Sequence, residues 1–370
     1  MKKITIGFLG NLNFDTRAFN FFNSLTTLGN EVNFIGFDWL TEDFIGYTDE
    51  NISITKLVKR KFSILFYLNF FFILLTSALK RKSDIYLASD FFSLPVLFIT
   101  AKIFRKKIFY DSRELFTELP FHENKPLVRK TIKFVEKYLI ERVDAVFTTG
   151  EMDTDYLKKL YSVENIYLQR NLPVKNDSII PINLSEKFSI PADSVIILYQ
   201  GIVVKGRGLE IYFNALSERS NLYLIILGGG EHLEYYKTLS KKMGLFKQTI
   251  FAGKIQQSEI LNYTAGAFAG LSVIDNIGIN NYYALPNKLF EYLMAGIPVI
   301  VNNLPQMKKI VDEYKVGAVI DENSENSLNE ILFKWKNNKS IYNELKQNCK
   351  NASVELNWEN EFNKNRYLFQ

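Results

Sequence analysis

The sequence is poor in the residues that build metal and redox sites. It has one cysteine, Cys349, and two histidines in 370 residues. A single thiol forms no disulfide within the chain and no cysteine-based zinc site, and two histidines exclude a histidine-rich metal site. Proline and glycine are at ordinary levels, 9 and 19 residues, which excludes collagen-like and low-complexity architectures. We expect a cytoplasmic protein of a reducing compartment.

An excess of one charge is also missing overall. The chain has 45 basic and 40 acidic residues, for a net charge of +5. This balance is unlike that of a dedicated nucleic-acid binder, so we expect no nucleic-acid partner. With 47% hydrophobic residues over 370 positions, the chain is long enough for two folded domains.

Long apolar runs are few. The start, MKKITIGFLG, resembles a signal peptide, but the run is short and Asn11, Asp15 and Arg17 follow without a cleavage site, which favours a buried strand. The longest run, Phe62–Leu79, is about 18 residues, at the lower limit for a membrane span. It contains Asn69 and other polar residues, so we expect a buried helix there.

Positive charge is concentrated in one window. Between Lys56 and Lys107 there are 11 basic residues and two acids, Asp84 and Asp90, interleaved with Phe, Leu and Ile. This is the composition of a surface that rests on anionic lipid headgroups. A solvated rim around a buried helix explains it equally well. The first reading implies peripheral association with the inner face of the plasma membrane, and the sequence leaves both open.

Strand and helix patterns alternate along the whole chain. This alternation predicts an α/β protein with two doubly wound, Rossmann-like parallel sheets. A proline-containing stretch without periodicity, residues 172–194, is the predicted linker. The predicted strands are 3–9, 31–37, 84–88, 107–110, 145–148 and 166–169, then 195–199, 223–227, 249–252, 269–272, 299–301 and 318–320.

Two glycine-rich turns follow strands of the second half. Gly201 ends one strand, and Lys205 and Arg207 lie in the glycine turn that opens the next helix. Backbone N–H groups at a helix start attract anions, and the two cations add charge beside them. Gly229 lies in a second such turn, LGGGEH. Turns of this kind are also simple connectors.

A third motif is NNYYALPNKLFEYL, which begins at Asn280. Its proline suits the first turn of a helix, and we expect the N–H groups of Ala284, Leu285 and Asn287 to be unpaired there. Lys288 and Glu291 share a helix face. Phosphates near the lysine and ribose hydroxyls on the glutamate would fit a nucleotide, whereas the alternative is a surface ion pair.

Candidate residues also follow strands of the first half. Gly10 and Asn11 form the turn after the first strand, and Arg113 with Glu114 follows the strand 107–110. We expect the latter two to face the crevice between the domains, or else to form a neutralised pair on a loop. The triplet Asp153–Asp155 opens a helix, where acids favourably meet the helix dipole, so we predict no metal site.

With these motifs in view, the chain resembles the retaining glycosyltransferases of family 4, which have the GT-B fold. The resemblance is carried by YQG-x-x-x-K-G-R-G-L-E from Tyr199 and by Y-A-L-P-N-K-L-F-E-Y from Tyr283, close to the bacterial P-N-K-x-F-E-Y form. It implies two Rossmann-like domains facing a central crevice: an acceptor-side domain, 1–178, and a nucleotide-sugar domain, 179–345. A C-terminal helix, 346–370, should pack back on the first domain.

The resemblance also assigns roles. Arg207 and Lys288 should bind the donor diphosphate as catalytic groups, with Glu114 as the candidate base and Glu291 on the ribose. Donor contacts are further implied for Gly10, Asn11, Gly201, Lys205, Gly229, Tyr283, Ala284, Leu285 and Asn287. Two positions depart from the family: Tyr283 replaces the first glutamate of its E-x7-E motif, and Arg113 replaces a histidine that commonly contacts the donor sugar. Backbone N–H groups of Ala284 and Leu285 should then contact the sugar.

The implied activity is the transfer of a sugar, with retention, from a UDP- or GDP-linked donor to a hydroxyl of a lipid-linked or polysaccharide acceptor. No cofactor and no metal are expected. Three alternatives stay open: a catalytically silent relative acting as a partner subunit, a nucleotide-sugar epimerase of the same fold, and a nicotinamide oxidoreductase. The nicotinamide oxidoreductase would need a G-x-G-x-x-G turn after the first strand, and this sequence has none there.

Overall fold

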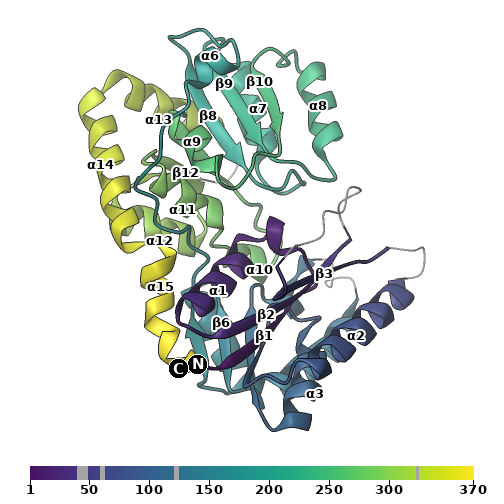
Figure 1. Ribbon diagram of the computed structural model, residues 1–370. Helices are drawn as coiled ribbons and strands as arrows, with labels where there is room; N and C mark the ends of the chain where they lie inside the picture. The colour runs from purple at the N-terminus through teal and green to yellow at the C-terminus, as the bar shows by residue number, and fades with distance from the viewer. Residues whose placement is uncertain (40–48, 59–62, 121–124, 322–324) are drawn as a thin grey trace. The chain divides into compact units, whose positions relative to one another are not determined.

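The chain folds into two compact units. The computed structural model describes residues 1–39, 49–58, 63–120, 125–321 and 325–370 (Figure 1). The first unit comprises Met1–Asn171 together with Trp358–Gln370, and the second comprises Leu172–Asn357. The chain therefore passes from the first unit to the second and returns to the first at its end.

The first unit is built on a seven-stranded sheet in the order β3-β2-β1-β4-β5-β6-β7. Every neighbouring pair is parallel, as the strand–helix alternation predicts. The strands are nearly continuous apolar runs because helices cover both faces. They are β1 (Lys3–Gly7), β2 (Glu31–Asp38), β3 (Ile52–Lys56), β4 (Ile85–Ala88), β5 (Lys107–Ser112), β6 (Ala145–Thr148) and β7 (Ile166–Leu168).

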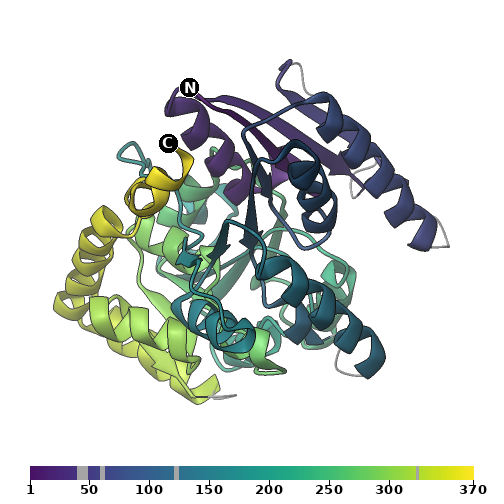
Figure 2. The same ribbon diagram turned by 90° about the horizontal axis from the view of Figure 1, so that it is seen from below.

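Helices cover this sheet from two sides. Figure 2 shows α2 and α3 together on one side and α1 with α15 on the other, in agreement with the contacts between these pairs. The helices are α1 (Thr16–Thr27), α2 (Ser63–Lys80), α3 (Leu94–Phe104), α4 (Pro126–Ile140), α5 (Glu151–Tyr161) and α15 (Trp358–Asn365), with the short helices η1 (Leu12–Phe14), η2 (Phe116–Glu118) and η4 (Arg366–Phe369).

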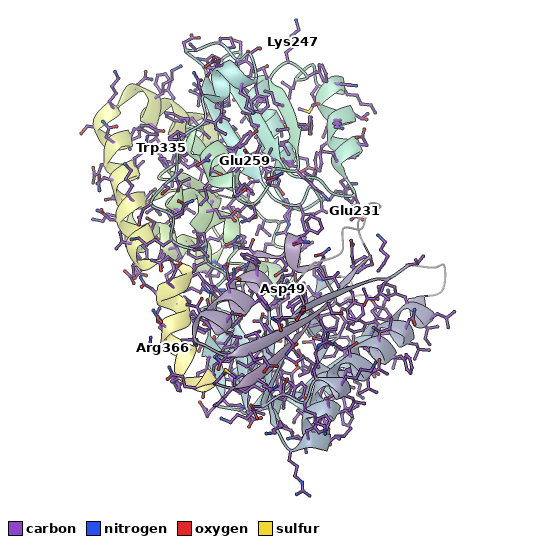
Figure 3. The ribbon with its side chains drawn as sticks, viewed as in Figure 1. Asp49, Glu231, Lys247, Glu259, Trp335 and Arg366 are labelled. Carbon is purple, nitrogen blue, oxygen red and sulfur yellow. The ribbon has the colours of Figure 1, made fainter. Side chains whose placement is uncertain are left out.

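The end of the chain completes the core of the first unit. The Trp358 ring meets Phe21 edge-on at 5.1 Å between centroids, and its indole N–H donates to Ser24 Oγ at 2.8 Å. Phe369 stacks on Phe147 at 5.7 Å. The predicted return of the C-terminal helix is confirmed for α15 and η4, on which Arg366 is labelled in Figure 3.

The second unit contains a six-stranded parallel sheet in the order β10-β9-β8-β11-β12-β13. Its strands are β8 (Val195–Gln200), β9 (Leu222–Leu227), β10 (Thr249–Gly253), β11 (Ala269–Ser272), β12 (Val299–Asn302) and β13 (Gly317–Ile320). Its helices are α6 (Leu184–Lys187), α7 (Leu209–Ser217), α8 (Leu233–Lys242), α9 (Ile260–Ala265), α10 (Ile279–Tyr282), α11 (Asn287–Met294), α12 (Pro305–Tyr314), α13 (Glu325–Asn337) and α14 (Lys339–Glu355). Separate apolar clusters fill the two sides of the sheet.

The structure differs from the sequence prediction in three places. The units change at Leu172 and Trp358, whereas the predicted boundaries follow residues 178 and 345. The reason at the second boundary is that α14 packs on α11, α12 and α13 and so belongs to the second unit. Strand β3 was not predicted, and α6 lies within the predicted linker.

The apolar run predicted as a buried helix forms α2. Its inner residues are buried, but a second apolar side is exposed, so the prediction is correct for one side only. Among the described residues, no helix has both the length and the apolar composition that a membrane span requires. Lys59, Arg60, Lys61 and Phe62, which belong to the predicted basic window and apolar run, lie outside the described residues.

Candidate functional site

Two glycine turns meet at the carboxyl edge of the second sheet. The Gly201 N–H donates to Leu227 O at 2.9 Å, and the Val203 N–H donates to Gly229 O at 3.0 Å. A Cβ at Gly228 would lie 1.9 Å from the Gly201 oxygen, and its φ of 144° is itself unfavourable for a side chain. The structure thus brings the candidates Gly201 and Gly229 together.

The turn that opens α7 also depends on glycine. Gly206 and Gly208 have φ values of 79° and 72°, in the left-handed region that glycine enters without strain. A Cβ at Gly208 would lie 2.5 Å from Val273 Cβ. The Asp275 N–H donates to Gly206 O at 3.0 Å, which fastens the turn to the loop after β11.

This turn presents two cations in different surroundings. Lys205 is exposed, and its ammonium lies 4.7 Å from the centre of the Tyr235 ring on α8. Arg207 is half-buried, and its positive charge acts on Lys288. Arg207 and Lys288, which come from separate motifs, therefore lie close enough to interact.

Helix α11 begins where its proline predicts. Pro286 has extended backbone angles, φ −75° and ψ 144°, and the helix follows from Asn287. The Leu289 N–H already donates to Pro286 O at 3.1 Å. Lys288 and Glu291 lie one turn apart and are 8% and 6% exposed, so the alternative of a surface ion pair is wrong.

Burial makes Lys288 an unusual cation. Its ammonium lies 4.0 Å from the centre of the Tyr199 ring, a favourable cation–π distance. Desolvation, with a further contribution from the Arg207 charge, lowers its pKa to about 7, although Glu291 acts in the opposite direction. An anion bound between the two cations would relieve their repulsion.

Glu291 is held by amide side chains. Gln200 Nε2 donates to Glu291 Oε2, and Asn287 Nδ2 donates to Oε1 at 2.7 Å. Gln200 is itself oriented by Thr264, whose hydroxyl donates to Gln200 Oε1 at 2.7 Å. Burial raises the pKa of Glu291, while its hydrogen bonds with Gln200, Gln257 and Asn287 lower it.

One acceptor beside this carboxylate has no hydrogen-bond partner among the described residues. It is the buried Asn287 Oδ1, and buried polar atoms without a hydrogen bond call for an explanation. Together with Glu291, whose oxygens can each accept a further hydrogen bond, it gives the site two side-chain acceptors for hydroxyl or N–H donors. The arrangement suits a vicinal diol such as that of a ribose.

The segment before α11 corrects one prediction. The Ala284 N–H donates to Asn281 O at 3.0 Å, so the prediction that it is unpaired was wrong. The cause is the short helix α10, whose last turn uses this group. Gln306 Nε2 donates to Tyr283 O and fixes the segment from α12. Leu285 is half-buried and packs against the core of the unit.

Gly10 and Asn11 belong to the first unit. Gly10 O accepts from the Phe37 N–H at 2.9 Å, and a Cβ at Gly10 would lie 2.3 Å from the Phe8 ring. Asn11 Oδ1 accepts from the Asn13 N–H at 3.0 Å and caps η1. Both residues therefore shape the turn after β1, and their expected donor contacts stay predictions.

The structure pairs Arg113 with two aspartates that neither sequence-based reading included, and the expectation that Arg113 faces a crevice stays a prediction. Arg113 Nη1 donates to Asp15 Oδ2 at 2.6 Å, and Nε donates to Asp111 Oδ2 at 3.2 Å. Arg17 binds the same Asp111 at 2.6 Å. Glu114 is exposed on the loop that follows β5. Asp111, which sequence reasoning missed, is the residue shared by two arginines.

Within the described residues, no three His, Cys, Asp or Glu side chains group as a metal site would require. Asp153 lies in the first turn of α5. The chemistry offered by the second unit is instead that of two close cations, a glycine turn and a buried carboxylate. These are groups for a phosphate and for hydroxyls.

Residues 182–353 match the family model of the glycosyl transferases group 1. The matched segment lies within the second unit and contains both glycine turns and α11. The candidate cations and Glu291 thus all fall in the part of the chain that matches this family.

Two curated relatives are glycosyltransferases. The chain is 25% identical over 236 residues to an uncharacterized glycosyltransferase of Methanocaldococcus jannaschii, covering 61% of this chain and 56% of the relative. It is 30% identical over 113 residues to the lipopolysaccharide core biosynthesis glycosyltransferase LpsD of Rhizobium meliloti, covering 30% of each. The chain thus matches 56% and 30% of the length of these relatives.

Solved structures resemble the whole chain. Sucrose-phosphate synthase from Thermosynechococcus elongatus has a TM-score of 0.80 at 15% identity, with 100% of this chain and 98% of that chain covered. HepE of Anabaena, in complex with UDP and glucose, has 0.79 at 13%, covering 100% and 99%. WaaG, a glycosyltransferase involved in lipopolysaccharide biosynthesis, has 0.70 at 15%, covering 99% of each. The predicted GT-B fold, two Rossmann-like parallel-sheet units, is confirmed.

Proposed function

We propose that this chain is a retaining glycosyltransferase that moves a sugar from a nucleoside diphosphate sugar to a hydroxyl of a lipid-linked or polysaccharide acceptor. The observation that carries the proposal is the joint placement of Arg207, buried Lys288 and Glu291 at one edge of the second sheet. The match to the group 1 glycosyl transferases supports it.

The donor diphosphate is bound by the two cations. The guanidinium of Arg207 and the ammonium of Lys288 neutralise the phosphoryl oxygens, and the ribose hydroxyls donate to Glu291 and Asn287 Oδ1. HepE, a solved structure with the same fold, binds UDP. This supports a UDP-linked donor more strongly than a GDP-linked one. The exposed Lys205 and the turns at Gly201 and Gly229 complete the proposed donor contacts.

The reaction places its developing charge on the departing diphosphate. The bond between the anomeric carbon and the phosphate oxygen breaks, and the acceptor oxygen forms its bond on the same face. The acceptor proton passes to the departing phosphate oxygen, and Glu114 is the one side chain proposed as an alternative base. Arg207 and Lys288 stabilise the leaving group electrostatically, so the proposal requires no metal ion and no cofactor.

The acceptor belongs to cell-surface glycan synthesis in this proposal. One curated relative acts in lipopolysaccharide core biosynthesis by its name, which supports a glycan acceptor on the inner side of the plasma membrane. The Tyr283 and Arg113 positions, which depart from the family pattern, are the proposed determinants of donor-sugar identity.

Thermal unfolding with added nucleotides tests the proposal. A nucleoside diphosphate at about 100 times its Kd should stabilise the fold by about 2.7 kcal/mol, which shifts a midpoint by several degrees. We expect a shift with UDP or GDP and none with CMP. Binding without turnover on any acceptor would favour the silent partner subunit. Sugar isomerisation without an acceptor would favour the epimerase, and no shift with any nucleotide would contradict the proposal.

A further inference from the structure

Helix α2 is apolar on two opposite sides. Its inner side repeats every four residues and is buried: Phe66, Phe70, Leu74 and Ala78. Its outer side carries apolar side chains that are 52–67% exposed: Ile64, Leu65, Leu68 and Phe72. A helix that is apolar all round is normally enclosed, and the outer side of α2 is not.

The same feature continues over the two neighbouring helices. Helix α3 contacts both α2 and α4, and the rings of Phe98 and Tyr138 join α3 to α4 at 6.3 Å. Exposed apolar residues on these helices are Ile99 and Ile103 on α3, and Leu127, Val128, Phe134 and Tyr138 on α4. We name these residues, with the outer side of α2, the α2–α4 surface. Exposed apolar side chains gathered on neighbouring helices are typical of interaction sites.

Cations accompany this surface, and acids on it are few. Exposed cations on or beside the three helices are Lys80, Lys82, Lys102, Arg105, Lys106, Lys107, Lys125, Lys130, Lys133 and Lys137. Within α4 the single acid, Glu136, is buried. The half-buried Asp84 is paired with Lys106 at 2.8 Å, and Glu141, just after α4, lies 3.7 Å from Lys137. The α2–α4 surface therefore combines exposed apolar groups with unbalanced positive charge.

We propose that the α2–α4 surface binds the anionic face of a lipid bilayer. The apolar side chains enter the boundary between headgroups and acyl chains, and the lysines contact lipid phosphates, as in interfacial helices. Charge selects this occupant over a second copy of the chain, because self-association would place like charges against each other. The surface extends the basic window of the sequence to α4, which lies outside that window.

This inference does not depend on the donor site. Vesicle binding requires no nucleotide sugar and no turnover. The chain could therefore fail to bind vesicles and still be a transferase, or bind vesicles without being one. If both hold, the enzyme is kept at the membrane that carries a lipid-linked acceptor.

Vesicle flotation of the full chain tests the proposal. The probes are vesicles of phosphatidylcholine alone and of an equimolar mixture with phosphatidylglycerol. We expect binding to the anionic vesicles, little binding to the neutral ones, and loss of binding at high salt as the charges are screened.

Two double variants test the surface itself. Lys130→Glu with Lys133→Glu should weaken binding to anionic vesicles at least 25-fold, since each lysine near such a membrane contributes about fivefold. Leu68→Ser with Phe72→Ser should weaken this binding as well, because the apolar side chains that would enter the bilayer are lost. Both residues of each pair are exposed, so the fold should survive, which circular dichroism and the unfolding midpoint check.

Matched controls lie in the second unit. Phe246 is 59% exposed, and Figure 3 shows the side chain of Lys247 pointing away from the ribbon. Phe246→Ser with Lys247→Glu should bind vesicles as the wild type does. Equal binding to neutral and anionic vesicles, or wild-type binding by both surface variants, would overturn the proposal. So would a dimer in sedimentation equilibrium that the serine pair disperses, without any vesicle binding.

Discussion

The ammonium of Lys288 lies 4.0 Å from the centre of the Tyr199 ring, in the interior of the second unit. The ring stabilises the charged ammonium by a cation–π contact, but burial and the nearby Arg207 lower the lysine pKa to about 7. Lys288 therefore changes its charge near neutral pH. A lysine in water would do so more than three pH units higher, so this residue couples ligand binding to protons.

The first prediction concerns the pH dependence of nucleoside diphosphate binding. A diphosphate stabilises the charged form of Lys288 and raises its pKa. Below about pH 7 the lysine is already charged, so affinity should change little there. Above about pH 7 binding must take up a proton, and affinity should fall by up to about tenfold per pH unit. Calorimetry in buffers of different ionisation enthalpy measures both the affinity and the proton uptake.

The control for this prediction is Lys288→Met, which keeps the length and removes the charge. Its affinity should be weaker throughout and nearly constant between pH 7 and pH 9. A slope equal to that of the wild type would assign the titration to another group and remove Lys288 from the donor site.

The second prediction concerns Glu291. Glu291→Gln keeps the shape but gives up the charged acceptor, and hydrogen bonds to charged groups contribute about 1.5–3 kcal/mol. Nucleoside diphosphate affinity should therefore fall about 10- to 100-fold, as measured by calorimetry. The control is Glu234→Gln on α8, an exposed carboxylate paired with Lys237, which should bind as the wild type does. Unchanged affinity in the Glu291 variant would exclude a ribose contact.

The third prediction concerns Arg207. Removing a preorganised donor to a developing charge costs about 2.7–4 kcal/mol of barrier, so Arg207→Ala should lower turnover about 100-fold or more. Arg207→Lys should fall between, because it keeps the charge without the planar fork. Arg219→Ala, at another half-buried arginine of the second unit, should leave turnover unchanged. Near-normal turnover of Arg207→Ala in steady-state assays would exclude a catalytic role.

The fourth prediction concerns the stability of the first unit. Glu136 on α4 is 1% exposed, and the Tyr161 hydroxyl donates to it at 2.5 Å. Burial raises its pKa from 4.5 to about 7. The folded state therefore holds a proton that the unfolded state releases between these values, and the free energy of unfolding should decrease as pH rises from about 4.5 to about 7.

Glu136→Gln removes this dependence. The variant should match the wild type near pH 4.5 and exceed its free energy of unfolding at pH 8 by up to about 3 kcal/mol. Urea titrations at the two pH values measure the difference. Glu141→Gln, on an exposed carboxylate just after the same helix, should leave the pH profile as it is in the wild type. A steep decline retained in the Glu136 variant would show that another group controls it.

Much of the fold could be predicted because buried parallel strands leave a plain sequence signal. Val195–Gln200 is fully buried and is preceded and followed by turn residues. Strand β3 escaped prediction because ISITK is short and four of its five residues are only half-buried, so its pattern is weak. Most of helix α14 was predicted to pack on the first unit, because the pattern of its apolar residues does not indicate which unit they contact.

The candidate site could be predicted only where its residues are neighbours in sequence. Lys288 and Glu291 lie on one helix, and glycines and cations mark the turn before α7. Gln200 was missed because its partner Glu291 lies 91 positions further on. A signal existed, since Gln200 is the polar end of an otherwise apolar strand. Asp111 likewise ends an apolar stretch, and only the tertiary structure shows that two arginines share it.

The return of Trp358–Gln370 to the first unit sets an order of events during synthesis. Phe21 and Phe147 leave the ribosome early, whereas the Trp358 and Phe369 rings that cover them are translated only after the whole second unit. The second unit is one uninterrupted segment of the chain. It can therefore fold while the core of the first unit still lacks Trp358–Gln370. A nascent chain that stops before Trp358 therefore leaves an open aromatic surface, which is a target for chaperones and proteases.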